Sequence, residues 1–353
     1  MSKLMTIIPV YNGELYLRST LDSIAAQTRR PDRVIVLDNC STDGTRKVVQ
    51  NYRGLDGLEY RRNERHVIVF ENFNRALDFA EETECLHIMS ADDLLEPRFF
   101  EVLFPHLDRM GGRGLAFTGI HVIDETGRVT QPYPRVRGAA WRRLTLREFL
   151  VRQMELRHVY CQSVVLKTAR RPAPVRFRVE GWRQAVDVMF FAEWALHGES
   201  IIEVREPLCL YRLHSISITG GNLGDLDAWV MEEWRAMLEV QSLLGDAPAR
   251  RWFTSQKLKC IFAARSRVKM SLTRASNPEY AREIGRRTRE VVGPLAWCAG
   301  GLAVFVRDCC RKLAKRAPSH PLPQTGGTGI SGESRTYGQG GHEIRSRGQS
   351  GES

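Results

Sequence analysis

The chain has 353 residues and a formal net charge of +11, and 42% of its residues are hydrophobic and 26% charged. This balance is typical of a globular protein with a buried core, and it excludes collagen, a coiled coil and disorder throughout. Most of the cations are arginines. The arginine excess fits anionic partners, because guanidinium groups bind phosphate and carboxylate well, and it equally fits the codon bias of a GC-rich genome.

The cysteines and the first residues bear on the cellular compartment. The eight cysteines are scattered and form no Cys-x-x-Cys pair, so the sequence does not indicate a zinc ribbon. The chain opens on Met1-Ser2-Lys3, and its first apolar run stops at Pro9, which is unlike a secretory signal. We therefore expect reduced thiols and a cytoplasmic protein, either free or peripheral on the cytoplasmic face of the inner membrane.

In the first part of the chain, short apolar runs alternate with amphipathic stretches. The runs predict strands at Leu4–Val10, Arg33–Asp38, Leu58–Arg62 and Cys85–Met89. The stretches between them predict helices at Gly13–Gln27, Asp43–Tyr52 and Phe70–Glu81. Such alternation is typical of right-handed βαβ units, so we expect an α/β fold with a Rossmann-like, mostly parallel sheet flanked by helices.

The middle of the chain is less regular. It predicts a helix from Pro97 to about Met110, a strand at Leu115–Asp124, a loop over 128–143, a helix at Leu144–Glu155, a strand at Tyr160–Leu166, an irregular connection over 168–182, a helix at Asp187–His197 and a strand at Ile201–Arg205. We place the end of this first domain at residue 222.

A helical extension, 223–316, follows the first domain. Residues 225–290 are amphipathic, and 291–306 are uncharged between basic flanks. That uncharged segment is shorter than the ~20 residues of a spanning helix, so it fits either the membrane surface or a buried helix. The remaining residues, 317–353, are rich in Gly and Ser and predict a disordered tail.

Polar residues follow the predicted parallel strands at the edge where ligands bind in open α/β sheets. They form three clusters, at Pro9–Gly13, Asp38–Gly44 and Ser90–Asp93. Because the sequence has neither Gly-x-Gly-x-x-Gly after the first strand nor a P-loop, dinucleotide oxidoreductases and P-loop phosphotransferases lose their main support.

The adjacent carboxylates Asp92 and Asp93 are the most informative of these residues. Two neighbouring negative charges at a strand end are unfavourable unless solvent or a cation compensates them. A divalent cation that bridges to a diphosphate would do so, since Mg²⁺ binds through one or two carboxylates plus substrate phosphates. Capping of the helix after Pro97 remains an alternative role for the pair.

Four motifs in this order resemble the family 2 glycosyltransferases, which have the GT-A fold. They are IIPVYNGELYLRSTLDSIAAQT, VIVLDNCSTDGT, NFNRALDFA and IMSADDLLEP. Two later segments, VDVMFFAEWALHG and PLCLYRLHSISIT, extend the resemblance to about residue 219. It implies an inverting enzyme that takes a sugar from a nucleoside-diphosphate sugar.

The resemblance also implies roles for single residues. For donor binding we expect Pro9, Tyr11, Asn12, Asp38, Asn63, Asn72, Asp93 and Arg212. Turn and capping roles for Asn63 and Asn72 stay equally open, and Arg212 fits either a phosphate contact or a strand face. Asp92 and His214 are the implied ligands of Mn²⁺ or Mg²⁺, and Asp187 is the implied catalytic base.

Three residues depart from the family pattern. Ser90 stands in place of the first Asp of Asp-x-Asp, which leaves Asp92 as the principal metal ligand. Asn39 stands where a second Asp is frequent, and Val186 replaces the usual Glu before Asp187. The last change bears on acceptor positioning, because the base itself is present.

We therefore expect a metal-assisted hexosyltransferase that acts in bacterial cell-envelope polysaccharide biosynthesis. Its donor would be an NDP-sugar, with UDP-sugars first, and its acceptor a hydroxyl group of a surface glycan or of a lipid-linked glycan. Three alternatives remain: a nucleotide-sugar-binding protein without turnover, a nucleotidyltransferase, for which the Gly-rich loop is missing, and a basic nucleic-acid-binding protein, for which no motif is present.

Overall fold

The computed structural model describes residues 2–134, 138–157, 159–214, 217 and 224–304. These described residues belong to one compact unit. The expected tail at 317–353 and the expected domain boundaries at 222 and 316 lie outside the described residues, so the division of the chain into domains stays a prediction.

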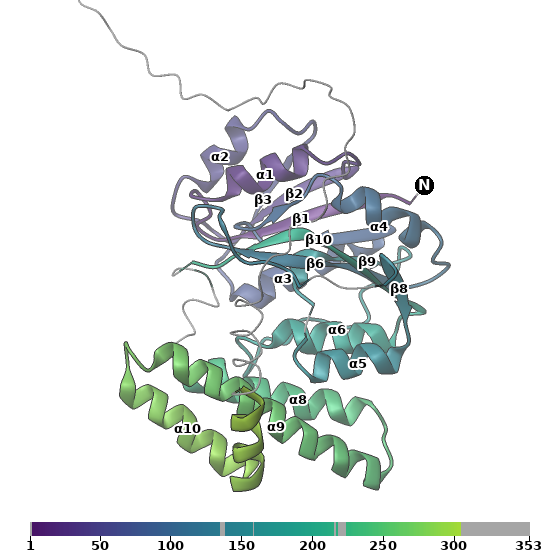
Figure 1. The fold of residues 1–353 in the computed structure, drawn as a ribbon. Coiled ribbons are helices and arrows are strands. Elements are labelled where there is room, and N and C mark those ends of the chain that lie inside the picture. Colours follow the sequence, from purple (N-terminus) through teal and green to yellow (C-terminus); the bar gives the residue numbers. More distant parts are fainter. Residues whose placement is uncertain (1, 135–137, 158, 215–216, 218–223, 305–353) are drawn as a thin grey trace, which may run out of the picture. The chain divides into compact units, whose positions relative to one another are not determined.

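A mixed sheet forms the centre of this unit (Figure 1). Its strands are β1 Leu4–Val10, β2 Arg33–Asp38, β3 Glu59–Arg62, β4 Cys85–Ile88, β5 Leu94–Leu95, β6 Gly114–Ile123, β7 Val129–Gln131, β8 Trp141–Leu144, β9 Val164–Lys167 and β10 Ser200–Arg212. Their order is β3-β2-β1-β4-β9-β6-β10-β5, with β7 paired to β6 and β8 to β10. Strands β3, β2, β1, β4, β6 and β10 run in one direction, which confirms the expected mostly parallel sheet.

Helices cover both faces of the sheet. They are α1 Leu17–Ala25, α2 Thr45–Asn51, α3 Val69–Leu77, α4 Phe99–Asp108, α5 Leu146–Met154 and α6 Val186–Leu196, and a 3₁₀ turn, Asp78–Glu81, follows α3. Alternate residues of β1 point to opposite faces, as the strand period requires. Leu4 and Ile8 pack with α1, α2 and α4, whereas Met5 and Ile7 belong to the core with α3, α5 and α6.

Three details of the middle region differ from the expectation. The segment 128–143, expected to be a loop, contains β7 and most of β8. Strand β10 continues past Arg205 to Arg212, with register shifts around Pro207. The expected strand at Tyr160–Leu166 begins as a 3₁₀ turn, Cys161–Ser163, before β9. In each case an edge position, a proline or a turn breaks the apolar alternation that identifies a strand from sequence.

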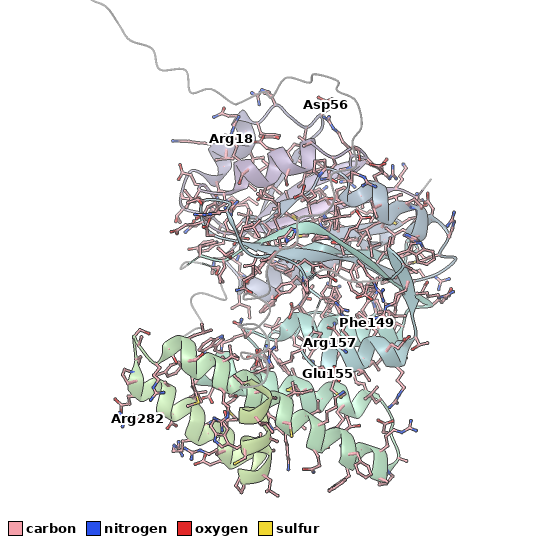
Figure 2. All side chains as sticks on the ribbon, in the orientation of Figure 1. Arg18, Asp56, Phe149, Glu155, Arg157 and Arg282 are labelled. Carbon is pink, nitrogen blue, oxygen red and sulfur yellow. The ribbon has the colours of Figure 1, made fainter. Side chains whose placement is uncertain are left out.

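The last helices confirm the helical character expected for 225–290. They are the π-helix η3 Asp227–Met231, α8 Glu232–Leu243, α9 Pro248–Thr273 and α10 Pro278–Val292, and residues 294–304 are also helical. Asn277 caps α10 by accepting a hydrogen bond from the Tyr280 amide. Glu155, just after α5, pairs with Arg157 and with Lys257 of α9, which ties α9 to the sheet-bearing part (Figure 2).

The uncharged segment after α10 packs on α9 through small residues. A Cβ added to Gly300 would meet Ala263 Cβ at 2.6 Å, so only glycine allows this close approach. Leu295 and Leu302 nevertheless remain 88% and 64% exposed. Within the described ranges, every helix is too short or too polar to span a bilayer.

Candidate functional site

A cavity of about 1070 Å³ opens at the carboxyl ends of β1, β2 and β4. Eight of the residues expected in the site line it: Pro9, Tyr11, Asn12, Asn72, Asp92, Asp93, Asp187 and His214. Asp38, Asn63 and Arg212 do not belong to the lining. The sequence motifs therefore converge on one space, and three of the expected residues lie behind its wall.

The two residues expected to hold a metal are in contact. His214 Nε2 lies 2.9 Å from Asp92 Oδ2, and the Tyr16 ring stands 4.9 Å from the imidazole, between ring centroids. The His214 side chain is 6% exposed, and its Nδ1 is buried without a hydrogen-bond partner in the described part of the chain.

This pair fits a divalent cation that shares its coordination with a substrate. No three His, Cys, Asp or Glu side chains gather as a metal site among the described residues. A cation at Asp92 and His214 would therefore need further oxygen ligands, and substrate phosphates commonly supply these to Mg²⁺ or Mn²⁺.

Asp93 and Arg212 hold the backbone around Asp92 in place. Asp93 is fully buried, and its Oδ1 accepts a 2.6 Å hydrogen bond from the Arg212 amide. Burial, together with the neighbouring charge of Asp92, raises the pKa of Asp93 well above its usual value. The Arg212 guanidinium donates to the carbonyl oxygens of Asp92, Asp124 and Glu125 at 2.7–3.1 Å, so it fixes the backbone that carries Asp92.

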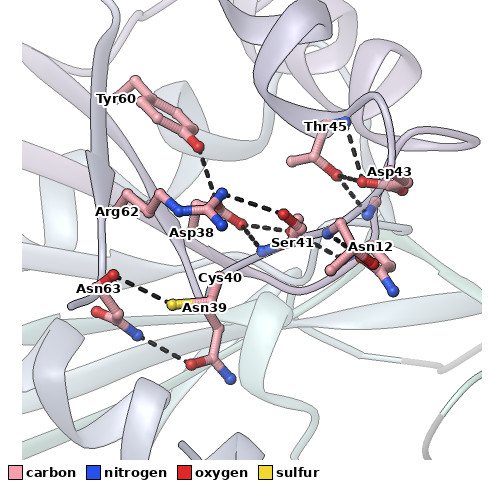
Figure 3. A network of polar contacts seen from close by, with 12 residues as sticks. Asn12, Asp38, Asn39, Cys40, Ser41, Asp43, Thr45, Tyr60, Arg62 and Asn63 are labelled. Atoms are coloured by element: carbon pink, nitrogen blue, oxygen red, sulfur yellow. Dashed lines mark hydrogen bonds and ion pairs between the residues drawn. The ribbon is translucent and has the colours of Figure 1, made fainter. Parts of the chain in front are cut away.

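Asp38 is the centre of a second polar network (Figure 3). Its carboxylate accepts hydrogen bonds from the Ser41 amide and hydroxyl, from the Tyr60 hydroxyl at 2.6 Å and from Arg62 at 2.9 Å. Since its oxygens already have these four donors and it is fully buried, Asp38 orders the loop after β2.

The loop after β2 is in turn joined to the loop after β1. The Asn12 amide donates to Ser41 Oγ at 2.9 Å, and Asn12 Oδ1 accepts from the Thr42 amide at 2.8 Å. Asn12 has a left-handed backbone with φ 52°, and Cys40 has φ 63°. Asparagine tolerates this conformation better than most residues, so Asn12 suits the tight turn that shapes the cavity rim.

A row of buried amides stands behind this rim. The Asn63 side chain donates to Asn39 Oδ1 at 3.0 Å and to Asn72 Oδ1 at 2.8 Å, and Asn72 donates to the Leu37 carbonyl at 3.2 Å. Asn39 and Asn72 line the cavity, and Asn63 joins them from outside it. Asn39, at a position where the family frequently has Asp, is thus held by a network of neutral amides.

His66, which sequence reasoning missed, forms an aromatic pair with the expected Tyr11 at the same rim. The rings of Tyr11 and His66 are 4.5 Å apart between centroids, with an interplanar angle of 61°, and Tyr11 is 50% exposed. Both line the cavity. His66 lies in a connection without apolar periodicity, so no pattern in the sequence singled it out.

Asp187 lines another part of the cavity, in the first turn of α6. Tyr160 lies nearby: burial raises the pKa of its hydroxyl to about 12, and the Asp187 charge adds to this shift. Val186, where the family has Glu, is fully buried in the core. The carboxylate of Asp187 is therefore the one that this end of α6 offers to the cavity.

The C-terminal helices supply a wall of the cavity, which the sequence did not predict. Arg265 donates to Glu233 at 2.7 and 3.2 Å, and Lys269 Nζ lies 2.9 Å from Glu233 Oε2. All three residues line the cavity. Burial alone raises the pKa of Glu233, but the charges of Lys269 and Arg265 outweigh burial and lower it to about 2.

Comparisons with known proteins agree with this architecture. The family model described as glycosyl transferase family 2 matches residues 6–173. An uncharacterized protein of Mycobacterium tuberculosis is 29% identical over 220 residues, which are 61% of this chain and 60% of that relative. The match thus spans less than two thirds of the relative's length.

A second relative is a named enzyme. Poly(ribitol-phosphate) beta-N-acetylglucosaminyltransferase TarS of Staphylococcus aureus is 42% identical over 55 residues, 15% of this chain and 10% of TarS. The crystal structure of S. aureus TarS 1–349 in complex with UDP superposes with a TM-score of 0.51 at 19% identity, and the match covers 77% of this chain and 73% of that chain. At that identity the likeness is one of fold, and it confirms the expected GT-A architecture.

Proposed function

We propose that this protein transfers a sugar from a nucleoside-diphosphate sugar to an acceptor hydroxyl with inversion at the anomeric carbon, because the model of glycosyl transferase family 2 matches residues 6–173. One observation carries the proposal: Asp92 and Asp187, from distant parts of the chain, line the same cavity. A transferase of this kind needs one group to stabilise the departing diphosphate and another to remove the acceptor proton.

The rim at Pro9, Tyr11 and Asn12 would hold the nucleoside, with the Tyr11–His66 pair against the base. Asp92 and His214 would hold Mn²⁺ or Mg²⁺ next to the diphosphate. When bound, such a cation acts as a Lewis acid that offsets the charge of the leaving group. TarS is named for transferring N-acetylglucosamine, so UDP-N-acetylglucosamine is the first donor to try.

Asp187 would act as the base. Its carboxylate takes the proton of the acceptor hydroxyl, the acceptor oxygen forms the bond to C1, and the C1–oxygen bond to the diphosphate breaks with its electron pair. Attack from the side opposite the leaving group inverts the anomeric centre in one displacement. Asp38, Asp93 and Arg212 keep the two loops in place and need not touch the donor.

The acceptor would be a hydroxyl of a surface glycan or a lipid-linked glycan, and the protein would then act in cell-envelope polysaccharide synthesis. Exposed Leu295 and Leu302, on a segment that follows the basic end of α10, support a location at the cytoplasmic face of the membrane. This location would be contradicted if the full-length protein were recovered entirely in the soluble fraction without detergent.

The test is nucleotide release from a panel of NDP-sugars with Mn²⁺ or with EDTA, since slow donor hydrolysis needs no known acceptor. We expect metal-dependent release from one donor, lost in Asp92→Ala. In Asp187→Asn, transfer to a discovered acceptor should be lost while donor binding persists. The exposed Asp56, labelled in Figure 2, provides the matched control Asp56→Asn.

Two further measurements separate the alternatives. Calorimetric binding of UDP or GDP without any turnover, even with acceptor mixtures, would indicate a nucleotide-binding protein that lacks catalysis. Absence of both binding and turnover would reject the proposal, and salt-sensitive retention on a polyanion column would then favour a nucleic-acid partner.

A further inference from the structure

Helix α9 has two apolar stripes that serve different purposes. One contains Leu258, Phe262 and Ala263, which are fully buried in the core. The other contains Ile261, Ala264, Val268 and Leu272. The spacing of three and four residues puts this second set on one side of the helix, and all four residues line the cavity.

The second stripe, Ile261–Ala264–Val268–Leu272, runs from the interior to solvent. Its first three residues are partly buried, and Leu272 is 69% exposed. Ala303, from the helical segment 294–304, also lines the cavity and is exposed. The outer end of the stripe is therefore apolar, and an apolar surface left open to water favours a ligand that covers it.

Charged side chains line the cavity beside the stripe. Asp187, Glu233 and Arg265 belong to the lining, and Tyr160, which also lines it, interacts with the charges of all three. The cavity therefore combines charged groups, Lys269 among them, with the aliphatic side chains of the stripe.

The cavity is large, and its lining extends well beyond the donor rim. Single small-molecule sites measure about 300–1,000 Å³, and this cavity, at about 1070 Å³, lies at the upper end of that range with both Tyr11 and Leu272 in its lining. The residues around Tyr11, Asn12 and Asp92 suffice for a donor, so the region along α9 is left for the acceptor.

We propose that the acceptor is amphiphilic, with its hydroxyl-bearing sugar at Asp187 and an alkyl chain along the Ile261–Leu272 stripe of α9. This inference rests on the proposed function for the identity of the ligand as an acceptor, and it chooses a lipid-linked glycan over a free glycan. An alkyl chain covers the stripe without unpaired polar groups, while a free glycan would leave its hydroxyls against aliphatic side chains.

The experiment uses the full-length protein and n-octyl β-glucoside below its critical micelle concentration, followed by titration calorimetry. We expect saturable one-to-one binding of n-octyl β-glucoside and at least tenfold weaker binding of methyl β-glucoside. Val268→Asp should weaken octyl glucoside binding at least about tenfold, because it places a charge within the stripe. Leu272→Asp places the charge at an exposed position, where we expect folding to be unaffected, and it should also weaken octyl glucoside binding.

Ser271→Asp is the matched control, since it adds the same charge to the same helix at an exposed position outside the cavity lining. NDP-sugar hydrolysis and octyl glucoside binding should both stay unchanged in Ser271→Asp. The proposal would be overturned if octyl glucoside showed no saturable binding, or if Val268→Asp and Leu272→Asp both bound it as well as wild type. Octyl glucoside binding in a protein that neither binds nor hydrolyses any NDP-sugar would instead overturn the proposed function, and with it the assignment of the ligand as an acceptor.

Discussion

His214 Nε2 lies 2.9 Å from Asp92 Oδ2, although 122 residues separate the two in the chain. The contact depends on β10, which pairs with β6 along its length and so delivers Arg212 and His214 to the end of β4. The Arg212 guanidinium then donates to the backbone carbonyl of Asp92, and the Arg212 amide donates to the carboxylate of Asp93. The candidate metal site is thus assembled by a strand that contains none of the early motifs.

Loss of His214 should weaken the response to metal. We expect His214→Ala to raise the Mn²⁺ concentration for half-maximal donor hydrolysis by roughly a hundredfold, because one of two protein ligands is gone. A Mn²⁺ titration of nucleotide release measures this. The exposed His197, at the end of α6, gives the control His197→Ala, and an unchanged Mn²⁺ requirement in His214→Ala would remove His214 from the metal site.

Removal of the Tyr11 ring should weaken nucleotide binding without unfolding the protein. Stacking of a base on an aromatic side chain contributes about 1–3 kcal/mol, so Tyr11→Ala should bind UDP about tenfold more weakly or worse. Tyr11→Phe keeps the ring and should bind nearly as well as wild type. Calorimetry with UDP and Mn²⁺ distinguishes them, and equal losses in both variants would assign the effect to the hydroxyl.

Glu233→Gln should destabilise the C-terminal helices. It leaves the buried cations of Arg265 and Lys269 without their counter-charge, which costs about 3–5 kcal/mol in comparable buried pairs. Urea denaturation measures the loss. Glu239→Gln, which breaks a more exposed pair with Arg178, is the control and should lose far less.

The Glu233 carboxylate also makes the stability of the folded protein depend on pH. The pKa of Glu233 is about 2 in the folded protein against 4.5 for a free side chain, so the folded state binds fewer protons between these values. Its stabilising contribution is therefore complete above pH 4.5 and is lost as the pH falls toward 2. The stability difference between wild type and Glu233→Gln should narrow over that interval, and a constant difference would contradict the assignment.

Asn63→Ala should reduce stability more than it reduces nucleotide binding. The substitution leaves Asn39 Oδ1 and Asn72 Oδ1 each without one donor in a buried environment, at a cost of about 1–3 kcal/mol. Thermal denaturation tests stability, with Asn51→Ala, at the exposed end of α2, as the control. A large loss of UDP affinity with unchanged stability would instead support direct contact between Asn63 and the nucleotide.

Local sequence patterns predicted the bounds of the strands that are buried on both faces. Strands β1 and β2 have the predicted bounds, because continuous apolar runs ended by polar turns have few other interpretations. Strand β10 was predicted only to Arg205. Its second half passes Glu206 and Pro207 with shifts of register, and pairing with β6 and β5, which no local pattern reports, keeps it extended.

The candidate site was likewise predicted in part. Strand-end positions in the sequence placed Tyr11, Asn12 and Asp92 at the cavity, since parallel strands share one edge. The strand-end positions did not predict which side chains face the cavity. Asp38 is buried among four hydrogen-bond donors, and Asn63 lies behind Asn72, to which it donates a hydrogen bond. The α9 wall was missed because two apolar stripes on one helix blur the single-face periodicity by which a surface helix is recognised.

The position of the α9 wall in the chain has an evolutionary consequence. The family model ends at residue 173, whereas the Ile261–Leu272 stripe lies far beyond it. The rim proposed to bind the nucleoside and the stripe proposed to face the acceptor are thus encoded in separate stretches of the gene. Selection on one stretch can change which molecules are modified while the other continues to use the same activated sugar.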